Sequence, residues 1–113
     1  MMRQHDVVIQ RERDGTVHVN IKAPRLVYHS PTGYEYGYGG SGPSDLALNV
    51  LEEFYVARFP TAERSARLYK GMCTEFTMMH HNDFKFAVIA RLDRNVDTHR
   101  VSAESINRWI TDR

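Results

Sequence analysis

The chain has 113 residues, of which 42% are hydrophobic and 26% are charged, and its formal net charge is +1. This length predicts a single domain with its own hydrophobic core, and the composition excludes intrinsic disorder. The near-neutral charge excludes polyanion binding through total charge alone, and the single cysteine, Cys73, excludes an internal disulfide and multi-cysteine zinc sites.

The first predicted elements are the strands of a β-hairpin. An apolar run at 7–9 is followed by an Asp-Gly pair at 14–15 and by alternating apolar and polar residues over 17–22. Asp-Gly suits the tight turn that such a hairpin needs. Turn residues delimit two further predicted strands, over 26–29 and over 34–38.

A glycine-rich turn then leads into a helix predicted from about Pro43 to Ala57. Proline is favoured in the first turn, and Gly42 or Ser41 suits the N-cap. We expect Asp45 to accept hydrogen bonds from first-turn amides and to oppose the positive end of the helix dipole. The apolar positions cover roughly half of the helix circumference, which predicts burial against both the sheet and another helix.

The other side of this helix is expected to be polar, with Asn49, Glu52 and Glu53 on it. Pro60 ends the helix. A second, polar helix is predicted over 61–70, with its arginines on one side.

The segment 78–92 is compatible with either a buried strand or a helix, and we favour the helix. Four apolar residues follow the i, i+3, i+4, i+8 spacing of a helix: Phe84, Ala87, Val88 and Leu92. Asn82 or Asp83 is the predicted cap. An extended segment over 98–101 and a final helix capped by Ser102 complete the chain.

These elements predict one α+β domain over residues 1–113, with an N-terminal antiparallel sheet of three or four strands packed against three to four helices. The N-terminus has no apolar signal segment, and no stretch approaches about eighteen apolar residues. We therefore expect a cytoplasmic protein.

The glycine turn contains the string G-x-G-x-x-G between a predicted strand and a helix. A Rossmann unit requires a following parallel strand that ends in an acidic residue, whereas Pro60 and a polar segment follow here. The P-loop pattern fails as well, because Pro43-Ser44 replaces Lys-Ser/Thr. A structural turn is favoured. The alternative is a phosphate-binding loop formed by Gly39, Gly40, Ser41, Gly42 and Ser44.

The sequence contains no recognisable catalytic set. Ser41 lies in Gly-Gly-Ser-Gly-Pro and not in the G-x-S-x-G pattern of a nucleophile elbow. The six histidines form no H-x-x-x-H pair and no cysteine-histidine ligand spacing, so we predict no metal site and no cofactor. These absences favour a binding protein over a catalyst.

Two features suit a protein interface. The first is the tyrosine strand over 34–38, which is either an exposed contact surface or core beneath the helix. The second is the basic segment 58–70, which is either a solvated face or a docking site for an acidic partner or a nucleic-acid backbone. The candidate interface residues are Tyr34, Tyr36, Tyr38, Arg58, Arg64, Arg67 and Lys70.

The glycine-proline run over 37–48, together with His81-x-x-Phe84-Lys85 and Ile106-x-x-Trp109-Ile110, resembles an uncharacterised family of small domains from bacteria, phages and other mobile elements. The resemblance extends from the Asp-Gly hairpin to the C-terminus. It implies a mobile-element origin, and it implies no established activity.

The leading hypothesis is a small phage or mobile-element accessory protein that contacts a host protein stoichiometrically and inhibits a host nuclease or defence complex, as anti-CRISPR proteins do. The alternative is a nucleotide or phosphate-ligand protein, or an enzyme, that uses the glycine loop at the helix N-terminus. The third hypothesis is DNA binding through segment 58–70. The near-neutral charge disfavours nucleic acid, and no membrane partner is expected.

Overall fold

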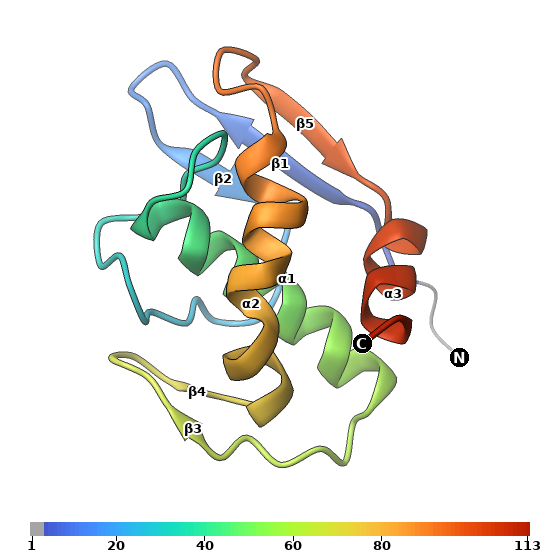
Figure 1. Cartoon of the computed structure of the whole chain (residues 1–113). Coiled ribbons are helices and arrows are strands. Elements are labelled where there is room, and N and C mark those ends of the chain that lie inside the picture. The colour runs from blue at the N-terminus through green and yellow to red at the C-terminus, as the bar shows by residue number, and fades with distance from the viewer. Residues whose placement is uncertain (1–3) are drawn as a thin grey trace.

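The computed structural model describes residues 4–113 and has an α+β fold, as predicted (Figure 1). In chain order its elements are β1 (Val7–Arg11), β2 (Val17–Val19), α1 (Ser41–Arg58), β3 (Ala66–Arg67), β4 (Met72–Cys73), α2 (Glu75–Ala87), the 3₁₀ helix η1 (Ile89–Arg91), β5 (Thr98–Val101) and α3 (Ala103–Thr111).

β1 is the central strand of a three-stranded antiparallel sheet with the order β2-β1-β5. β1 and β2 form the predicted hairpin, in which Ile9 lies opposite Val19, and Gly15 has a φ of +90° in the turn. β5 pairs antiparallel with the other edge of β1. The third strand therefore comes from the C-terminal part of the chain and not from segment 26–29.

Both strands predicted between β2 and α1 are wrong. In segment 26–29, Val27 forms only an isolated bridge with Lys70, in which the two residues exchange backbone hydrogen bonds. Segment 34–38 is irregular, and Gly37 within it has a φ of +85°, which is incompatible with a strand at that position. The alternating tyrosines of that segment therefore share no sheet face.

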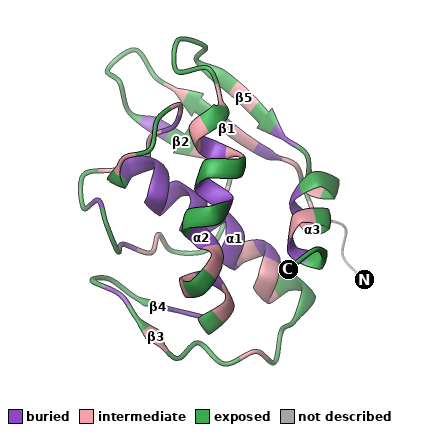
Figure 2. Cartoon of the chain, viewed as in Figure 1, coloured by how far each residue is buried: buried purple, intermediate pink, exposed green. Residues whose placement is uncertain are grey.

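α1 is the central element of the fold, and every residue over 42–52 is buried (Figure 2). Its apolar side chains pack in one core with residues of the sheet, α2 and α3, as the wide apolar arc predicted. The expectation of an open polar side is wrong for Asn49 and Glu52, which are also buried. Although α1 has 18 residues, no helix within residues 4–113 has the length and apolar character needed to cross a membrane.

The two later helices are present, with one shifted start. α2 begins at Glu75 after its N-cap Thr74, and the predicted caps Asn82 and Asp83 lie inside it. The choice of helix over strand is correct through Ala87, where α2 ends before η1. The predicted cap of α3 is confirmed, since Ser102 Oγ accepts a hydrogen bond from a backbone amide three residues later.

The predicted polar helix over 61–70 is wrong, and part of this segment belongs to the β3–β4 hairpin. Leu68 and Cys73 pack with Leu48 of α1 in a second apolar cluster. Gly71 has a φ of +91° in the hairpin turn. Helical charge pairs contribute only about 0.3–0.5 kcal/mol each, so this tertiary packing outweighs the local preference for a helix.

Candidate functional site

The glycine turn before α1 is shaped by close packing within the chain. Gly37 has a φ of +85°, and a Cβ atom on it would lie 2.8 Å from Arg94 Cα. A Cβ atom on Gly42 would lie 2.8 Å from Glu35 Cβ. Neighbouring residues of the same chain therefore account for the absence of side chains at these positions.

Ser44, a residue of the predicted phosphate loop, is engaged by a buried lysine. Lys85 of α2 is 6% exposed, and its Nζ donates hydrogen bonds to Ser44 Oγ at 2.9 Å and to the Gly39 carbonyl oxygen at 3.3 Å. Ser44 Oγ donates to the Gly40 carbonyl oxygen at 3.1 Å. Lys85 thus joins α2 to the glycine turn. Sequence reasoning missed this role because Lys85 is 46 residues from Gly39.

A pocket of about 360 Å³ lies beside the N-terminus of α1. It brings together four residues of the two predicted sites: Tyr34, Tyr38, Ser41 and Gly42. Its lining also includes two acidic residues, Asp14 and Glu35. Arg11 donates two hydrogen bonds of 2.8 Å to the Glu35 carboxylate, and this lowers the pKa of Glu35. Arg11 offsets the charge of Glu35, but the lining contains Asp14 and no basic side chain, so it is unfavourable for phosphate.

Asp45 holds the preceding loop, so its predicted role at the start of α1 is wrong. The side chain is fully buried, and its carboxylate accepts hydrogen bonds from the amides of His29 and Ser30, each at 2.8 Å, and from the amide of Tyr28 at 3.2 Å. The N-cap of α1 is Gly40, which makes no side-chain cap hydrogen bond. The acidic residue that the sequence suggested for the first turn of α1 therefore anchors the backbone of the loop over 28–30.

This loop places His29 against His81 of α2, with their Nε2 atoms 3.0 Å apart. His81 Nδ1 lies 3.0 Å from the Thr77 carbonyl oxygen and 3.1 Å from that of Met78. Both oxygens are acceptors, so the hydrogen-bond network assigns the proton of the neutral ring to Nδ1, and His29 Nε2 donates to His81 Nε2. Burial, together with the neighbouring His29, lowers the pKa of His81.

Glu52 is a second buried carboxylate on α1, and it fixes the corner between β4 and α2. It accepts hydrogen bonds from the Thr74 amide at 3.0 Å, from Thr74 Oγ1 at 2.8 Å and from Thr77 Oγ1 at 2.9 Å.

Burial raises the pKa of the neighbouring Cys73 to about 12, so this thiol is protonated at neutral pH. In the part of the chain that the structure describes, no three His, Cys, Asp or Glu residues are grouped to hold a metal ion.

The three tyrosines of the predicted interface have different environments. Tyr36 is fully buried, and its hydroxyl donates to the Val96 carbonyl oxygen at 2.6 Å. The ring of Tyr34 lies 4.9 Å from the Arg25 guanidinium, and burial raises the pKa of Tyr34 to about 12. Only Tyr38 is exposed. The tyrosines therefore form no continuous exposed stripe, and Tyr36 belongs to the core.

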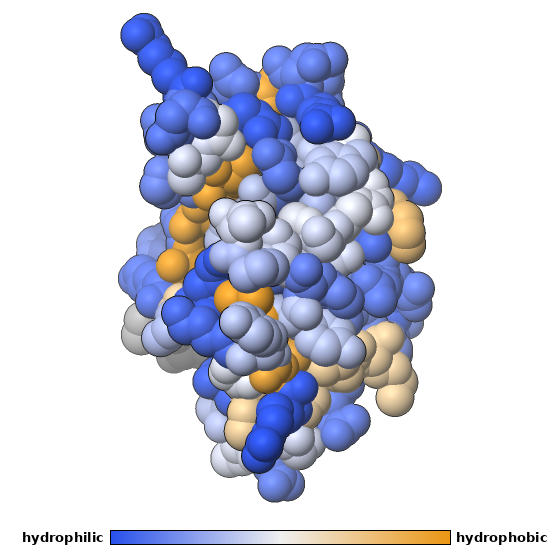
Figure 3. All heavy atoms as spheres, turned by 90° about the vertical axis from the view of Figure 1, so that its left-hand side faces the viewer, coloured by the Kyte–Doolittle hydropathy of each residue, from blue (hydrophilic) through white to orange (hydrophobic). Residues whose placement is uncertain are grey.

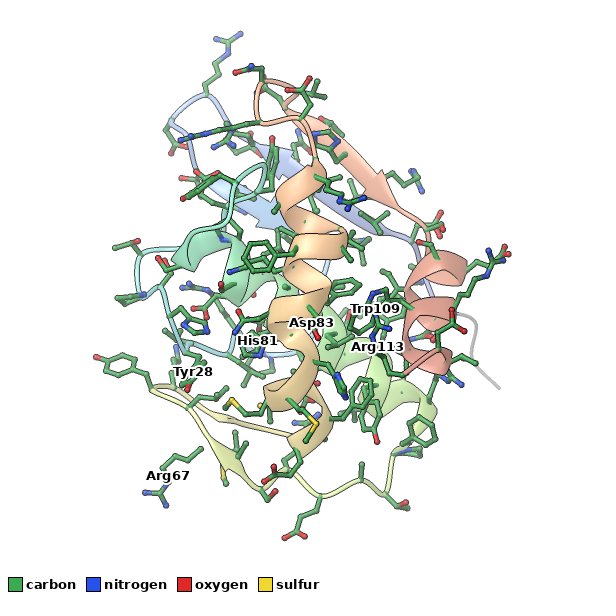
Figure 4. All side chains as sticks on the ribbon, in the orientation of Figure 1. Tyr28, Arg67, His81, Asp83, Trp109 and Arg113 are labelled. Carbon is green, nitrogen blue, oxygen red and sulfur yellow. The ribbon has the colours of Figure 1, made fainter. Side chains whose placement is uncertain are left out.

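The basic residues of segment 58–70 also separate into two groups. Arg58 donates a 2.9 Å hydrogen bond to a carbonyl oxygen of α3, and Arg64 Nε lies 3.5 Å from the buried Glu52 carboxylate. Arg67 and Lys70 are exposed on the β3–β4 hairpin, and neither forms a salt bridge with a residue over 4–113. The side chain of Arg67 points away from the ribbon (Figure 4).

The β3–β4 hairpin also presents an aromatic residue that the sequence reasoning did not single out. Tyr69 is 82% exposed at the hairpin turn. The Val27–Lys70 bridge places the exposed Tyr28 opposite Tyr69 in the antiparallel register. Tyr28, Arg67, Tyr69 and Lys70 are named the hairpin face below. In Figure 4, Tyr28 and Arg67 lie on the same side of the molecule.

Figure 3 shows that side of the molecule as mainly hydrophilic, with several small and separate hydrophobic areas. Tyr69 was overlooked because the segment was predicted to be a polar helix. The Gly71 that follows Lys70 was the available signal for a turn.

The comparisons with known proteins identify a family and no activity. The family described as "Family of unknown function (DUF6166)" matches the chain over residues 2–76, a range that includes the glycine-proline run. No curated protein and no solved structure matches the chain. The family match confirms the expectation of an uncharacterised domain family.

Proposed function

We propose that this chain, which belongs to the DUF6166 family of unknown function, acts by stoichiometric contact with another protein through the hairpin face. The observation that carries the proposal is Tyr69, an aromatic side chain that is 82% exposed at the turn of an anchored hairpin. Tyrosine and arginine are enriched among the residues that dominate the energy of protein interfaces.

The anchoring of the hairpin supports this proposal. The backbone of Lys70 is tied to Val27 by two hydrogen bonds of 2.9 and 3.0 Å, and Leu68 packs in the apolar cluster beneath the hairpin. Because this turn is held in place before binding, a partner would lose little free energy in ordering it. The hairpin face is therefore pre-organised.

Charge favours a particular kind of partner. Arg67 and Lys70 are exposed, and segment 66–73 contains no acidic residue. A partner with acidic residues around a pocket that accepts the Tyr69 ring would complement this face. DNA is a weaker candidate, because Arg58 and Arg64 make contacts within the chain and the net charge is only +1.

The biological part of the proposal is that the partner is a host nuclease or defence complex, which the protein inhibits in the host cytoplasm. This part rests on the resemblance of the glycine-proline motif to small domains of phages and mobile elements. Inhibition by stoichiometric contact requires no catalytic group on this chain.

The test is affinity capture from the host lysate, followed by measurement of binding to the purified partner. A Tyr69→Ala/Arg67→Glu variant should bind at least about tenfold more weakly while its melting temperature stays unchanged. Arg13→Glu, an equivalent charge reversal at an exposed position in the β1–β2 turn, is the matched control and should bind like the wild type. Equal binding by the hairpin variant, or capture of nucleic acid alone, would contradict the proposal.

A second candidate is a protein that binds a small ligand in the pocket of about 360 Å³ beside the N-terminus of α1. The hydroxyl groups of Thr16, Thr32 and Ser41 in its lining favour a polar ligand. Scanning fluorimetry with nucleotides and with neutral sugars tests this candidate, since a ligand that binds only the folded state raises the melting temperature.

A further inference from the structure

A second cavity of about 360 Å³, named the Glu52 pocket here, lies beside the middle of α1. Its walls come from the segment after β2 and from β4. They are mainly apolar and include Ile21, Pro24, Leu26 and Met72. Such walls favour the aliphatic part of a ligand, because burial removes apolar surface from water.

The cavity is lined by more acidic than basic side chains. Glu52 and Glu53, consecutive residues of α1, both line it, and Glu52 is 3% exposed. Arg64 is the only cation in the lining, so two acidic groups face one basic group. Asn49 also lines the cavity, but its amide oxygen accepts the Leu26 amide at 2.8 Å and its nitrogen donates to the Leu26 carbonyl oxygen at 2.9 Å.

Arg64 holds the position beside Glu52 that the cation of a ligand would take. Its Nε lies 3.5 Å from Glu52 Oε2, and its side chain is 50% exposed. Although the Glu52 carboxylate is buried, Arg64 is half exposed, and water can solvate its guanidinium when it leaves the carboxylate. A ligand cation that buries an aliphatic chain against the apolar walls would have an advantage that the Arg64 side chain lacks.

We propose that the Glu52 pocket binds a small organic cation, an ammonium or guanidinium group on an aliphatic chain. The charged group takes the place of Arg64 beside Glu52 Oε2, and Glu53, which accepts the Lys22 amide at 3.1 Å, adds negative charge to the lining. The chain contacts Ile21, Leu26 and Met72. This site shares no residue with the hairpin face.

The experiment is an NMR titration of the ¹⁵N-labelled protein with n-alkylammonium ions of increasing length. Saturable shifts are expected for amides over 21–26 and 49–53, with affinity rising about threefold per methylene. Pentanol, which has no charge, should bind at least about tenfold more weakly than pentylammonium. Equal binding of the alcohol, or no saturable shift, would overturn the proposal.

Two variants and a control sharpen the test. Arg64→Ala removes the competing cation and should strengthen pentylammonium binding about two- to fivefold. Glu53→Gln should weaken it about threefold or more, whereas Glu63→Gln, outside the pocket, should leave it unchanged. Weaker binding by a folded Arg64→Ala variant would refute the assigned role of Arg64.

A further titration distinguishes a free small-molecule cation from the arginine side chain of a peptide. N-acetylarginine amide should bind more weakly than butylguanidinium if the pocket takes a free small molecule, because its peptide groups would be buried unpaired. Tyr69→Ala must leave both affinities unchanged, so failure here and failure of the hairpin face are separate results.

Discussion

The glycine turn and the β3–β4 hairpin relate sequence to role in opposite ways. The glycine turn has the most distinctive sequence in the chain, yet its backbone packs against Arg94 and Glu35 of the same chain. The hairpin has an ordinary sequence, yet it exposes Tyr69 and Arg67 to solvent. A specific motif can thus serve internal packing, whereas a contact surface is recognised only when the fold shows which side chains are exposed.

The largest expected effect tests whether the region around the glycine turn is structural. Asp45→Ala leaves the amides of Tyr28, His29 and Ser30 without their acceptor, so the free energy of unfolding should fall by about 3 kcal/mol or more. Urea unfolding followed by circular dichroism measures this loss. Asp83→Ala, at an exposed position of α2, is the control and should cost less than about 0.5 kcal/mol. Equal losses of unfolding free energy in the two variants would contradict the structural role of Asp45.

A smaller effect is expected from two glycines that share a positive φ. Gly15 at +90° has open space around its α-carbon, whereas Gly37 at +85° lies against the Arg94 backbone. Gly15→Ala should cost about 1 kcal/mol from backbone strain, and Gly37→Ala should cost at least about twice as much because contact is added to strain. Thermal and urea unfolding compare the variants. A similar cost at both positions would mean that the turn tolerates a side chain.

The smallest effect of the three concerns His81 of α2, which contacts His29 in the loop before the glycine turn. The pKa of His81 is lowered in the folded state, so the unfolded chain binds this proton at a higher pH. Stability is therefore retained above the ordinary histidine pKa of about 6.5 and is lost as the pH falls below it. Unfolding between pH 7.5 and 5 should show this loss, and His81→Gln should reduce the dependence. Rising stability on acidification in this range would contradict it.

Several elements could be predicted from the sequence because their signals are local. The Asp-Gly turn specifies the first hairpin, the apolar arc after Pro43 specifies α1, and Ser102 specifies the start of α3. In each case neighbouring residues satisfy the backbone or form the apolar face. The candidate sites were less predictable, because they depend on pairs such as Ser44 with Lys85 and His29 with His81 that are distant in the chain.

By itself, the sequence determined the α+β class, the central helix and the position of the glycine turn, since turn chemistry and apolar periodicity act over a few residues. Only the tertiary structure decided that β5 completes the sheet, that Asp45 and Glu52 point inward and that Tyr69 points outward. Burial and hydrogen bonding across the fold set these outcomes. A carboxylate is stable inside when distant donors surround it, and no local pattern specifies those donors.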